Sequence, residues 1–189
     1  MTTVPDSLDQ RFRAAAASSG LLDVAYDLFD SPLGTLLLAA SPRGLCRISY
    51  DPEPEREAEA LAKRFGLRVL RAPLDDPRRQ LDEYFEGRRH SFQLELDLVG
   101  VGPFPRRVLE ELAQVPYGEV TTYGRLAAQV ERPRAARAVG TVMNRNPLPI
   151  VLPCHRVVGS TGKLVGYGGG LDRKERLLRL EGALLKTAR

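Results

Sequence analysis

Residues 148–156 read LPIVLPCHR, and they bring a cysteine, a histidine and an arginine together directly after two prolines. The chain of 189 residues has only two cysteines, Cys46 and Cys154, and only two histidines, His90 and His155. One of each rare residue therefore falls in a single dipeptide. Because proline stops helix propagation, the segment before Cys154 is expected to be extended or buried. The dipeptide is either a reactive thiol with its base or a buried inert cysteine beside a core histidine.

The chemistry open to this dipeptide depends on a proton acceptor, since a cysteine is a nucleophile only as the thiolate. In an extended strand adjacent side chains point to opposite faces, so direct contact between Cys154 and His155 needs a turn or a bridging water. A water relay to a histidine oriented by a carboxylate meets this objection. Glu181 lies among leucines in LLRLEGALL and is expected to point inward, where a carboxylate needs a partner. Cys154, His155 and Glu181 are therefore a candidate triad.

The composition limits the class of protein. A hydrophobic share of 43% and a charged share of 28% are those of a soluble globular protein, and no apolar run is long enough for a transmembrane helix. The N-terminus lacks the basic and apolar regions of a secretory signal, and two distant cysteines indicate free thiols, so we expect a cytoplasmic protein without membrane contact. A structural zinc site needs four Cys or His ligands, and this chain has four such residues in total, two of them adjacent. We therefore expect neither a metal nor a cofactor.

The charge is unevenly distributed along the chain. Residues 101–189 carry 15 basic and 7 acidic side chains, a net +8, whereas residues 1–100 carry a net −4. A basic second half favours an anionic partner such as nucleic acid, although a solvated basic face would show the same count.

The first half of the chain reads as a mixed α/β unit. Residues 1–20 are expected to form a loosely held tail or a short helix. Three β-runs separated by Pro and Gly turns follow from Leu21. Further elements are expected at 55–65 (helix), around LRVL at 67–70 (strand), at 77–86 (helix) and from Phe92 (half-buried strand). Gly and Pro cluster in VGVGPFP at 99–105, which predicts a domain boundary there.

The second half reads as mostly helical, with a turn-rich loop at 159–170. We expect helices at 106–114 and 122–129, with Thr121 or Thr122 as the N-cap of the second, and a further helix from Arg132–Pro133 to Pro147. Helices 122–129 and 132–147 fit a helix-turn-helix, although an ordinary α-hairpin has the same periodicity. A final helix begins at Asp172, with Asp172 and Glu175 as a capping pair. Its inward leucines are expected to be Leu177, Leu178, Leu180, Leu184 and Leu185.

Several blocks of sequence resemble one known family. PCHRV stands at 153–157 with Asn146–Pro147 upstream, and PYGEVTTYG at 116–124 and RAARAVG at 134–140 precede it at matching spacing. SPLGTLLLAASPRGLCRI at 31–48 adds an N-terminal block. Over roughly residues 22–184 the chain is similar to O6-alkylguanine-DNA alkyltransferases, the methylated-DNA–protein-cysteine methyltransferases.

The resemblance implies an α+β fold in two parts. Residues 21–99 would form a small α/β domain with an antiparallel sheet. Residues 100–189 would form a mostly helical domain with a winged-helix-like helix-turn-helix and the active-site cysteine. The implied activity is DNA repair: the monomeric protein would bind double-stranded DNA in the minor groove, flip out an alkylated guanine and transfer its alkyl group irreversibly to Cys154. Cooperative assembly on DNA stays open.

The resemblance also implies roles for individual residues. Cys154 would accept the alkyl group, His155 would take the thiol proton through a water, and Glu181 would orient the imidazole. Asn146 would fasten the turn before the active site, and Tyr123 would crowd the target phosphate and donate a hydrogen bond to the guanine ring.

Further residues would bind the DNA and the flipped base. Arg137 would enter the gap that the base leaves, and small residues would let its helix approach the groove. The implied DNA-binding residues are Arg137, Tyr123, Ala135, Ala136 and Arg134. The implied pocket residues are Pro149, Val157, Tyr167, Gly168 and Lys174.

Two other functions fit parts of the sequence. A papain-like thiol hydrolase would use Cys154 and His155, but such enzymes usually take base and thiol from distant segments. A helix-turn-helix regulator or damage sensor would bind DNA without chemistry. The zinc ligands of some animal family members have no counterpart here, and neither Cys46 nor residues 1–20 receive a role.

Overall fold

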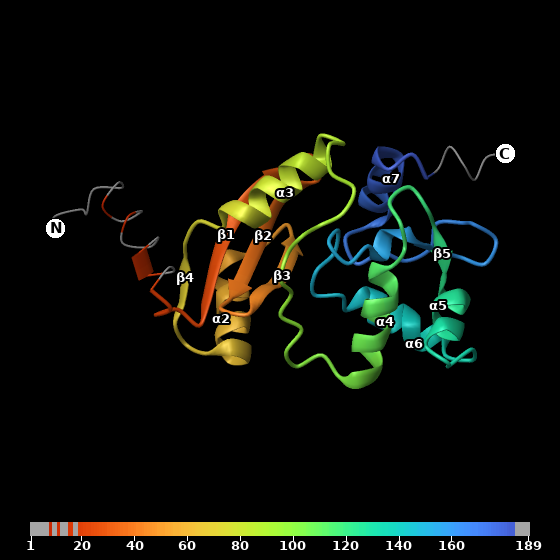
Figure 1. Cartoon of the computed structure of the whole chain (residues 1–189), viewed down its shortest axis with the longest axis horizontal. Coiled ribbons are helices and arrows are strands. Elements are labelled where there is room, and N and C mark those ends of the chain that lie inside the picture. The colour runs from red at the N-terminus through yellow and green to blue at the C-terminus, as the bar shows by residue number, and fades with distance from the viewer. Residues whose placement is uncertain (1–7, 9–10, 12–14, 17–18, 184–189) are drawn as a thin grey trace. The chain divides into compact units, whose positions relative to one another are not determined.

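The computed structural model describes residues 8, 11, 15–16 and 19–183 (Figure 1). Most of the predicted tail at 1–20 lies outside these residues, as do Leu184 and Leu185 of the predicted last helix. The chain folds as two compact units. Unit 1 comprises Met1–Asp82 with Gln93–Val99, and unit 2 comprises Glu83–Phe92 with Gly100–Arg189. The predicted domain boundary between residues 99 and 100 stays a prediction.

Unit 1 contains a four-stranded sheet in the order β3-β2-β1-β4. Strands β1 (Val24–Ser31), β2 (Gly34–Ser41) and β3 (Gly44–Tyr50) pair antiparallel, and β4 (Val69–Arg71) pairs parallel with β1. The three β-runs predicted from Leu21 onward are thus confirmed. Gly44 has a φ of 131°, and a Cβ there would lie 2.2 Å from the Glu95 carbonyl oxygen, so the turn into β3 requires glycine.

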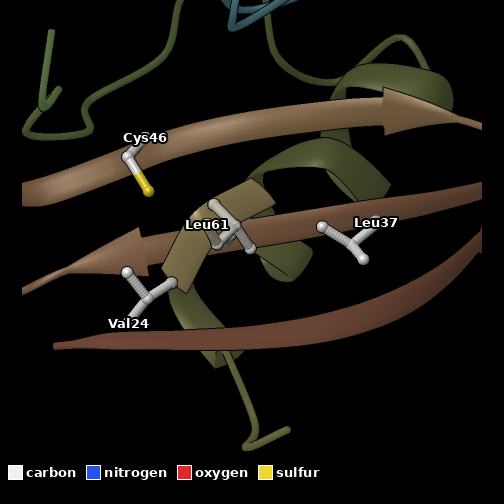
Figure 2. Packing of buried hydrophobic residues seen from close by; sticks show 5 residues of the cluster. Val24, Leu37, Cys46 and Leu61 are labelled. Atoms are coloured by element: carbon white, nitrogen blue, oxygen red, sulfur yellow. The ribbon is translucent and has the colours of Figure 1, made fainter. Parts of the chain in front are cut away.

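The core of unit 1 lies between this sheet and helix α2 (Pro54–Phe65). Leu61 of α2 packs with buried side chains of β1, β2 and β3, and four members of this cluster are labelled in Figure 2. Cys46 is one of them, and burial raises the pKa of its thiol to about 12. Cys46 is therefore a protonated, apolar core residue. The cluster consists of Val24, Leu37, Ala39, Cys46 and Leu61.

The predicted strand from Phe92 is wrong. Residues after Phe92 pair with the sheet only through an isolated bridge between Leu45 and Leu96. The Gln80 side chain accepts a hydrogen bond from the Gln93 N–H at 2.8 Å. A side chain therefore takes a backbone donor that a strand partner would otherwise use, and apolar alternation alone does not reveal this competition.

Helix α3 (Asp75–Phe85) confirms the helix predicted at 77–86, and it begins two residues earlier. Its residues up to Asp82 belong to unit 1, and its last turn belongs to unit 2. Gly87 follows the helix with a φ of 72°, and its N–H donates to the Tyr84 carbonyl. The last turn of α3 thus brings Tyr84 into unit 2.

Unit 2 is mostly helical, as predicted. Strand β5 (Thr121–Thr122) pairs parallel with β6 (Val157–Val158), and this short ladder joins the start of one helix to the end of the PCHRV segment. Together with the sheet of unit 1, these elements confirm the α+β class. The helices are α4 (Pro103–Ala113), α5 (Tyr123–Gln129), α6 (Ala136–Asn144), the 3₁₀ helix η1 (Cys154–Arg156) and α7 (Leu171–Leu180).

The start predicted for the second helix of the helix-turn-helix is wrong. Helix α6 begins at Ala136, not at Arg132, and it ends at Asn144. The Arg132 N–H donates to the Ala127 carbonyl at 2.8 Å, which closes a turn after α5. Proline therefore lies within the turn here and not in the first helical turn. Arg134 precedes α6 and is not part of it.

PLPIVLP at 147–153 was expected to be extended or buried; it is buried at Leu148, Ile150 and Leu152, and its backbone forms successive turns. The start predicted for the last helix is wrong. Helix α7 begins at Leu171, with Gly170 at the N-cap and no side-chain cap, so Asp172 and Glu175 are not a capping pair. No helix in the described ranges is long and apolar enough to cross a membrane.

Candidate functional site

The turn that carries Cys154 is tied at both ends by one side chain. Asn146 Nδ2 donates to the Leu152 carbonyl at 2.7 Å, and its Oδ1 accepts from the Leu148 N–H at 3.0 Å. Between these contacts Ile150 has a φ of 75°, an uncommon conformation for a β-branched residue. The buried apolar side chains of the turn hold it in place, and Pro149 is buried among them. The placement of Cys154 therefore depends on the Asn146 amide.

Cys154 is the first residue of η1 and is 4% exposed. Burial raises the pKa of its thiol to about 11, although a hydrogen bond from the Asn146 side chain and the charge of Lys174 oppose the rise. The thiol is thus protonated at neutral pH and needs a proton acceptor to react. Neighbouring side chains of a 3₁₀ helix diverge by about 120°, so the opposite-face geometry of a strand does not apply to Cys154 and His155.

His155 and Glu181 form a fully buried pair. The His155 Nε2 atom lies 2.8 Å from Glu181 Oε1, and both side chains have no exposed surface. Burial lowers the pKa of His155 despite the nearby carboxylate, so the ring is neutral at pH 7. Nε2 donates to the carboxylate, which leaves a lone pair on Nδ1. Nδ1 is buried and has no hydrogen-bond partner in the part of the chain described.

Arg156 completes an ion pair that the sequence reasoning missed. Its Nε donates to Glu181 Oε2 at 2.8 Å, and its Nη2 donates to Oε1 at 2.9 Å. Burial alone would raise the pKa of Glu181, but the hydrogen bonds from His155 and Arg156 outweigh it and lower the pKa to about 2. Glu181 is therefore a carboxylate throughout the neutral range. The arginine of the PCHR motif was the available signal for this contact.

Two more donors reach the same carboxylate. The Tyr84 hydroxyl donates to Oε1 at 2.7 Å, and the Gly118 N–H donates to Oε2 at 3.3 Å. Tyr84 is fully buried and lies 97 residues before Glu181 in the chain. Local sequence gave no signal for this contact.

Lys174 lies inside unit 2 with no exposed surface. Its Nζ donates to the carbonyl oxygens of Val157 at 2.6 Å, Val165 at 2.8 Å and Gly166 at 3.3 Å. Burial lowers the pKa of Lys174 to about 8, and the nearby Cys154 opposes this shift. Lys174 thus fixes the loop after Cys154 and supplies positive charge near the sulfur. The carbonyl of Val157, one of the implied pocket residues, thus accepts a hydrogen bond from this lysine.

The loop at 159–170 lies against the start of α5 and the end of α6. The Tyr123 hydroxyl donates to the Val165 carbonyl at 3.3 Å, so Tyr123 and Lys174 share one acceptor. Burial raises the pKa of Tyr123, and the proximity of Cys154 adds to the rise. A Cβ at Gly168 would lie 3.5 Å from the Asn144 carbonyl, whereas Tyr167 is half-buried. The structure thus brings Cys154, Tyr123 and this loop together.

The predicted DNA-binding residues lie on or before α6. Thr122 caps α5 by accepting from the Arg125 N–H at 3.2 Å, which confirms the predicted N-cap. Val139, Val142 and Met143 bury one face of α6, and the opposite face exposes Arg137. Ala138, Thr141 and Arg145 share this exposed face; Arg134 is exposed before the helix, and Ala135 and Ala136 are half-buried.

No cluster of three or more His, Cys, Asp or Glu side chains suited to a metal ion occurs in the described ranges. The polar groups near Cys154 instead belong to three sets of hydrogen bonds, which centre on Asn146, Lys174 and Glu181. A buried thiol next in the chain to a neutral, carboxylate-paired imidazole is an arrangement suited to a cysteine nucleophile.

Comparison with known proteins defines the family. Two family profiles match: "6-O-methylguanine DNA methyltransferase, ribonuclease-like domain" over residues 24–98 and "6-O-methylguanine DNA methyltransferase, DNA binding domain" over residues 103–183. A methylated-DNA–protein-cysteine methyltransferase of Methanosarcina barkeri is 42% identical over 159 residues, which are 82% of this chain and 96% of that protein. Its counterpart in Mycobacterium leprae is 43% identical over 157 residues, 80% of this chain and 88% of that protein.

A solved structure agrees with these relatives. The crystal structure of Mycobacterium tuberculosis OGT in complex with DNA matches with a TM-score of 0.72 and 38% identity, over 87% of this chain and 99% of that chain. The chain therefore belongs to the 6-O-methylguanine DNA methyltransferase family, and the resemblance of its sequence blocks is confirmed.

Proposed function

We propose that this protein repairs DNA by transferring the alkyl group of O6-alkylguanine in duplex DNA to the sulfur of its own Cys154. It is a methylated-DNA–protein-cysteine methyltransferase with double-stranded DNA as its partner. The observation that carries the proposal is a buried cysteine directly before the His155–Glu181 pair, in a chain of this family. The thioether that forms has no route back to the thiol, so each molecule reacts once.

The transfer follows from the arrangement of the proton acceptors. The Cys154 proton passes through a bridging water to Nδ1 of His155, and Glu181 stabilises the imidazolium that forms. The thiolate sulfur attacks the alkyl carbon. The S–C bond forms while the C–O6 bond breaks, and guanine departs as an anion with the electron pair of that bond. The proton that the guanine then takes up comes from the His155 imidazolium by way of water, so the thiol proton ends on the guanine. The Tyr123 hydroxyl donates a hydrogen bond to the guanine ring as negative charge develops. Neither a metal nor a cofactor is needed for this step.

The helix-turn-helix of α5 and α6 would hold the DNA through its minor groove. Half-buried Ala135 and Ala136 at the start of α6 add little bulk, which favours close approach to the groove. Arg134, in the turn before α6, would contact the phosphate backbone. The exposed Arg137 would fill the gap that the flipped base leaves, and Tyr123 would crowd the target phosphate.

The flipped base would enter a pocket beside Cys154. The walls would be the turn held by Asn146 and the loop held by Lys174, since these two side chains fix the segments on either side of η1. The lining residues that we propose are Pro149, Val157, Tyr167, Gly168 and Lys174. A cytoplasmic location fits the two free thiols, Cys46 and Cys154. We also propose that the protein acts as a monomer.

Intact mass spectrometry tests this function directly. After incubation with O6-methylguanine duplex DNA, the protein should gain the mass of one methylene group on the peptide that contains Cys154, and no more than one group per molecule. Unmodified guanine duplex serves as the control and should leave the mass unchanged. An unchanged mass in correctly folded protein would refute alkyl transfer, and repeated turnover would refute the single-use mechanism.

Arg137→Ala should slow repair of duplex DNA about tenfold or more, because flipping a base costs a few kcal/mol of stacking and pairing that the inserted side chain helps to offset. Repair of free O6-methylguanine base should change little, since no flipping is required. Single-turnover rates on both substrates measure the difference. Arg179→Ala, which removes an exposed arginine of α7 outside the helix-turn-helix, is the matched control. Equal slowing on both substrates would argue against the role of Arg137.

A further inference from the structure

The Tyr84 hydroxyl is held at the centre of the acid–base network by its own local structure. It is fully buried, and a buried hydroxyl needs a partner; here the partner is Glu181 Oε1 at 2.7 Å. The Tyr84 ring lies 5.4 Å from the Phe92 ring and 6.1 Å from the Tyr117 ring, measured between centroids. All of these residues belong to unit 2. The aromatic packing fixes the direction of the hydroxyl toward the carboxylate.

The segment that follows Tyr84 is also held in place. The N–H groups of Arg88 and Arg89 donate to the Glu83 carbonyl at 2.8 and 3.0 Å, and the Arg89 guanidinium pairs with the Glu83 carboxylate at 2.7 Å. The His90 ring stacks on the Tyr117 ring with 4.1 Å between centroids. The end of α3 is thus held within unit 2 by several contacts, and these contacts fix the Tyr84 hydroxyl beside Glu181.

One carboxylate oxygen receives both the Tyr84 hydroxyl and the His155 ring. Oε1 of Glu181 lies 2.7 Å from the former and 2.8 Å from Nε2 of the latter. A hydrogen bond donated to a carboxylate disperses its negative charge, so the carboxylate then stabilises a neighbouring imidazolium less. Burial raises the pKa of Tyr84 well above its usual value, so this donor keeps its proton over the whole range in which histidine titrates.

We propose that Tyr84 is a positioning residue for the alkyl transfer: its hydrogen bond to Glu181 Oε1 limits how strongly that carboxylate attracts the protonated His155 ring. As the pH falls, His155 therefore stays neutral to a lower pH than it would if Glu181 lacked the Tyr84 hydrogen bond. While the ring is neutral, its Nδ1 can take the thiol proton. The proposal rests on the proposed function, because it assigns His155 as the base. Among the described residues, the charged and titratable groups around the His155–Glu181 pair are Tyr84 from α3, Cys154 and Arg156 from η1, Lys174 from α7, and Tyr117.

The test is the pH profile of the methyl-transfer rate constant with saturating protein and O6-methylguanine duplex DNA. Tyr84→Phe removes the hydroxyl and keeps the ring. We expect the acid limb of the profile, where the rate falls as His155 becomes protonated, to move to higher pH by about 0.5–1 unit. At pH values on the acid side of the limb the rate should then be about 3–10-fold lower than in the natural protein, and at higher pH it should be near normal. Tyr117→Phe is the matched control, because it also loses a hydroxyl, one that donates to the Leu180 carbonyl at 3.0 Å and not to Glu181. Its acid limb should stay in place.

A second variant keeps the test decisive if Tyr84→Phe does not fold. Site-specific 3-fluorotyrosine at position 84 makes the phenol a stronger donor in a nearly unchanged volume, so the acid limb should move to lower pH. If both Tyr84 variants are active and the acid limb moves in neither, the role of Tyr84 is overturned and the proposed function stays intact. The same holds if the acid limb moves equally in Tyr117→Phe. Absence of alkyl transfer in the unmodified protein would instead overturn the proposed function.

Discussion

Cys154→Ala abolishes the mass gain on incubation with O6-methylguanine duplex DNA, because the sulfur is the atom that receives the alkyl group. The second cysteine cannot replace it, because Cys46 is buried in the core of unit 1 and burial raises the pKa of its thiol to about 12. DNA affinity should stay within about twofold, since the sulfur contributes no charge to phosphate binding. Intact mass and a duplex-binding titration on the same sample measure the two effects.

The control for Cys154→Ala is the same change at the other cysteine. Cys46→Ala should keep full methyl transfer and lose about 1–2 kcal/mol of stability, because it leaves a small cavity in a packed core. A methylated Cys154→Ala protein would show that another residue accepts the alkyl group. Loss of DNA binding in correctly folded Cys154→Ala protein would place the cysteine in the DNA interface and contradict its role as acceptor alone.

Glu181→Gln should lower both stability and activity. The change leaves the buried Arg156 guanidinium without its counter-charge, and breaking one side of a buried ion pair costs about 3–5 kcal/mol. For a chain of this size that corresponds to a fall in Tm of roughly 6–20 °C. The methyl-transfer rate should fall about 100-fold, because the His155 imidazolium loses the negative charge that stabilises it, although the glutamine oxygen can still accept a hydrogen bond from Nε2. Thermal unfolding and single-turnover kinetics measure the two losses.

The stability difference between the natural protein and Glu181→Gln should shrink in acid. Hydrogen bonds from His155 and Arg156 lower the pKa of Glu181 to about 2 in the folded state, against 4.5 as the ordinary value. Below pH 4.5 the unfolded chain therefore binds more protons at this residue than the folded chain does. Its stabilising contribution, full above pH 4.5, is lost as pH falls toward 2, by about 2 kcal/mol at pH 3. Urea unfolding at pH 7 and pH 3 tests this.

A neighbouring glutamate provides the control for both effects. Glu175 pairs with Arg179 on the surface of α7, and Glu175→Gln should change the free energy of unfolding by less than about 0.5 kcal/mol. Equal acid sensitivity in the natural protein and Glu181→Gln would show that Glu181 is not the group whose protonation weakens the fold. A Glu181→Gln protein of unchanged stability would show that Arg156 does not depend on this carboxylate.

Some features of the site followed from local sequence. The leucines around Glu181 indicated an inward carboxylate, and the structure buries it against His155. The sequence also predicted Thr121 or Thr122 as the N-cap of the helix at 122–129, because a threonine hydroxyl can accept from a free N–H of the first turn, and the structure shows that Thr122 does so. Apolar alternation gave a wrong prediction where a side chain forms a hydrogen bond with a backbone N–H. Residues after Phe92 have the alternation of a strand, but the Gln80 side chain holds the Gln93 N–H.

The proline-rich stretch before Cys154 shows the same limit. Its prolines excluded a regular helix, yet they could not distinguish an extended segment from the turns that Asn146 ties together. The Arg132–Pro133 pair matched a helix start, but α6 begins at Ala136, because the backbone first closes a turn onto α5. In both places the conformation depends on local hydrogen bonds between residues two to six positions apart, and neither apolar periodicity nor the position of proline reveals these bonds.

The sequence by itself determined the chemistry: a thiol, an adjacent imidazole, an inward carboxylate and a basic second half are all readable from residue types and their order. Only the tertiary structure decided which atoms meet. Tyr84 reaches Glu181 across 97 residues, and Arg156 turns onto the same carboxylate through the 3₁₀ turn of η1. The reason is physical: a buried charge is satisfied by whichever donors the packed chain brings within hydrogen-bond distance, and donors far apart in sequence leave no periodic pattern.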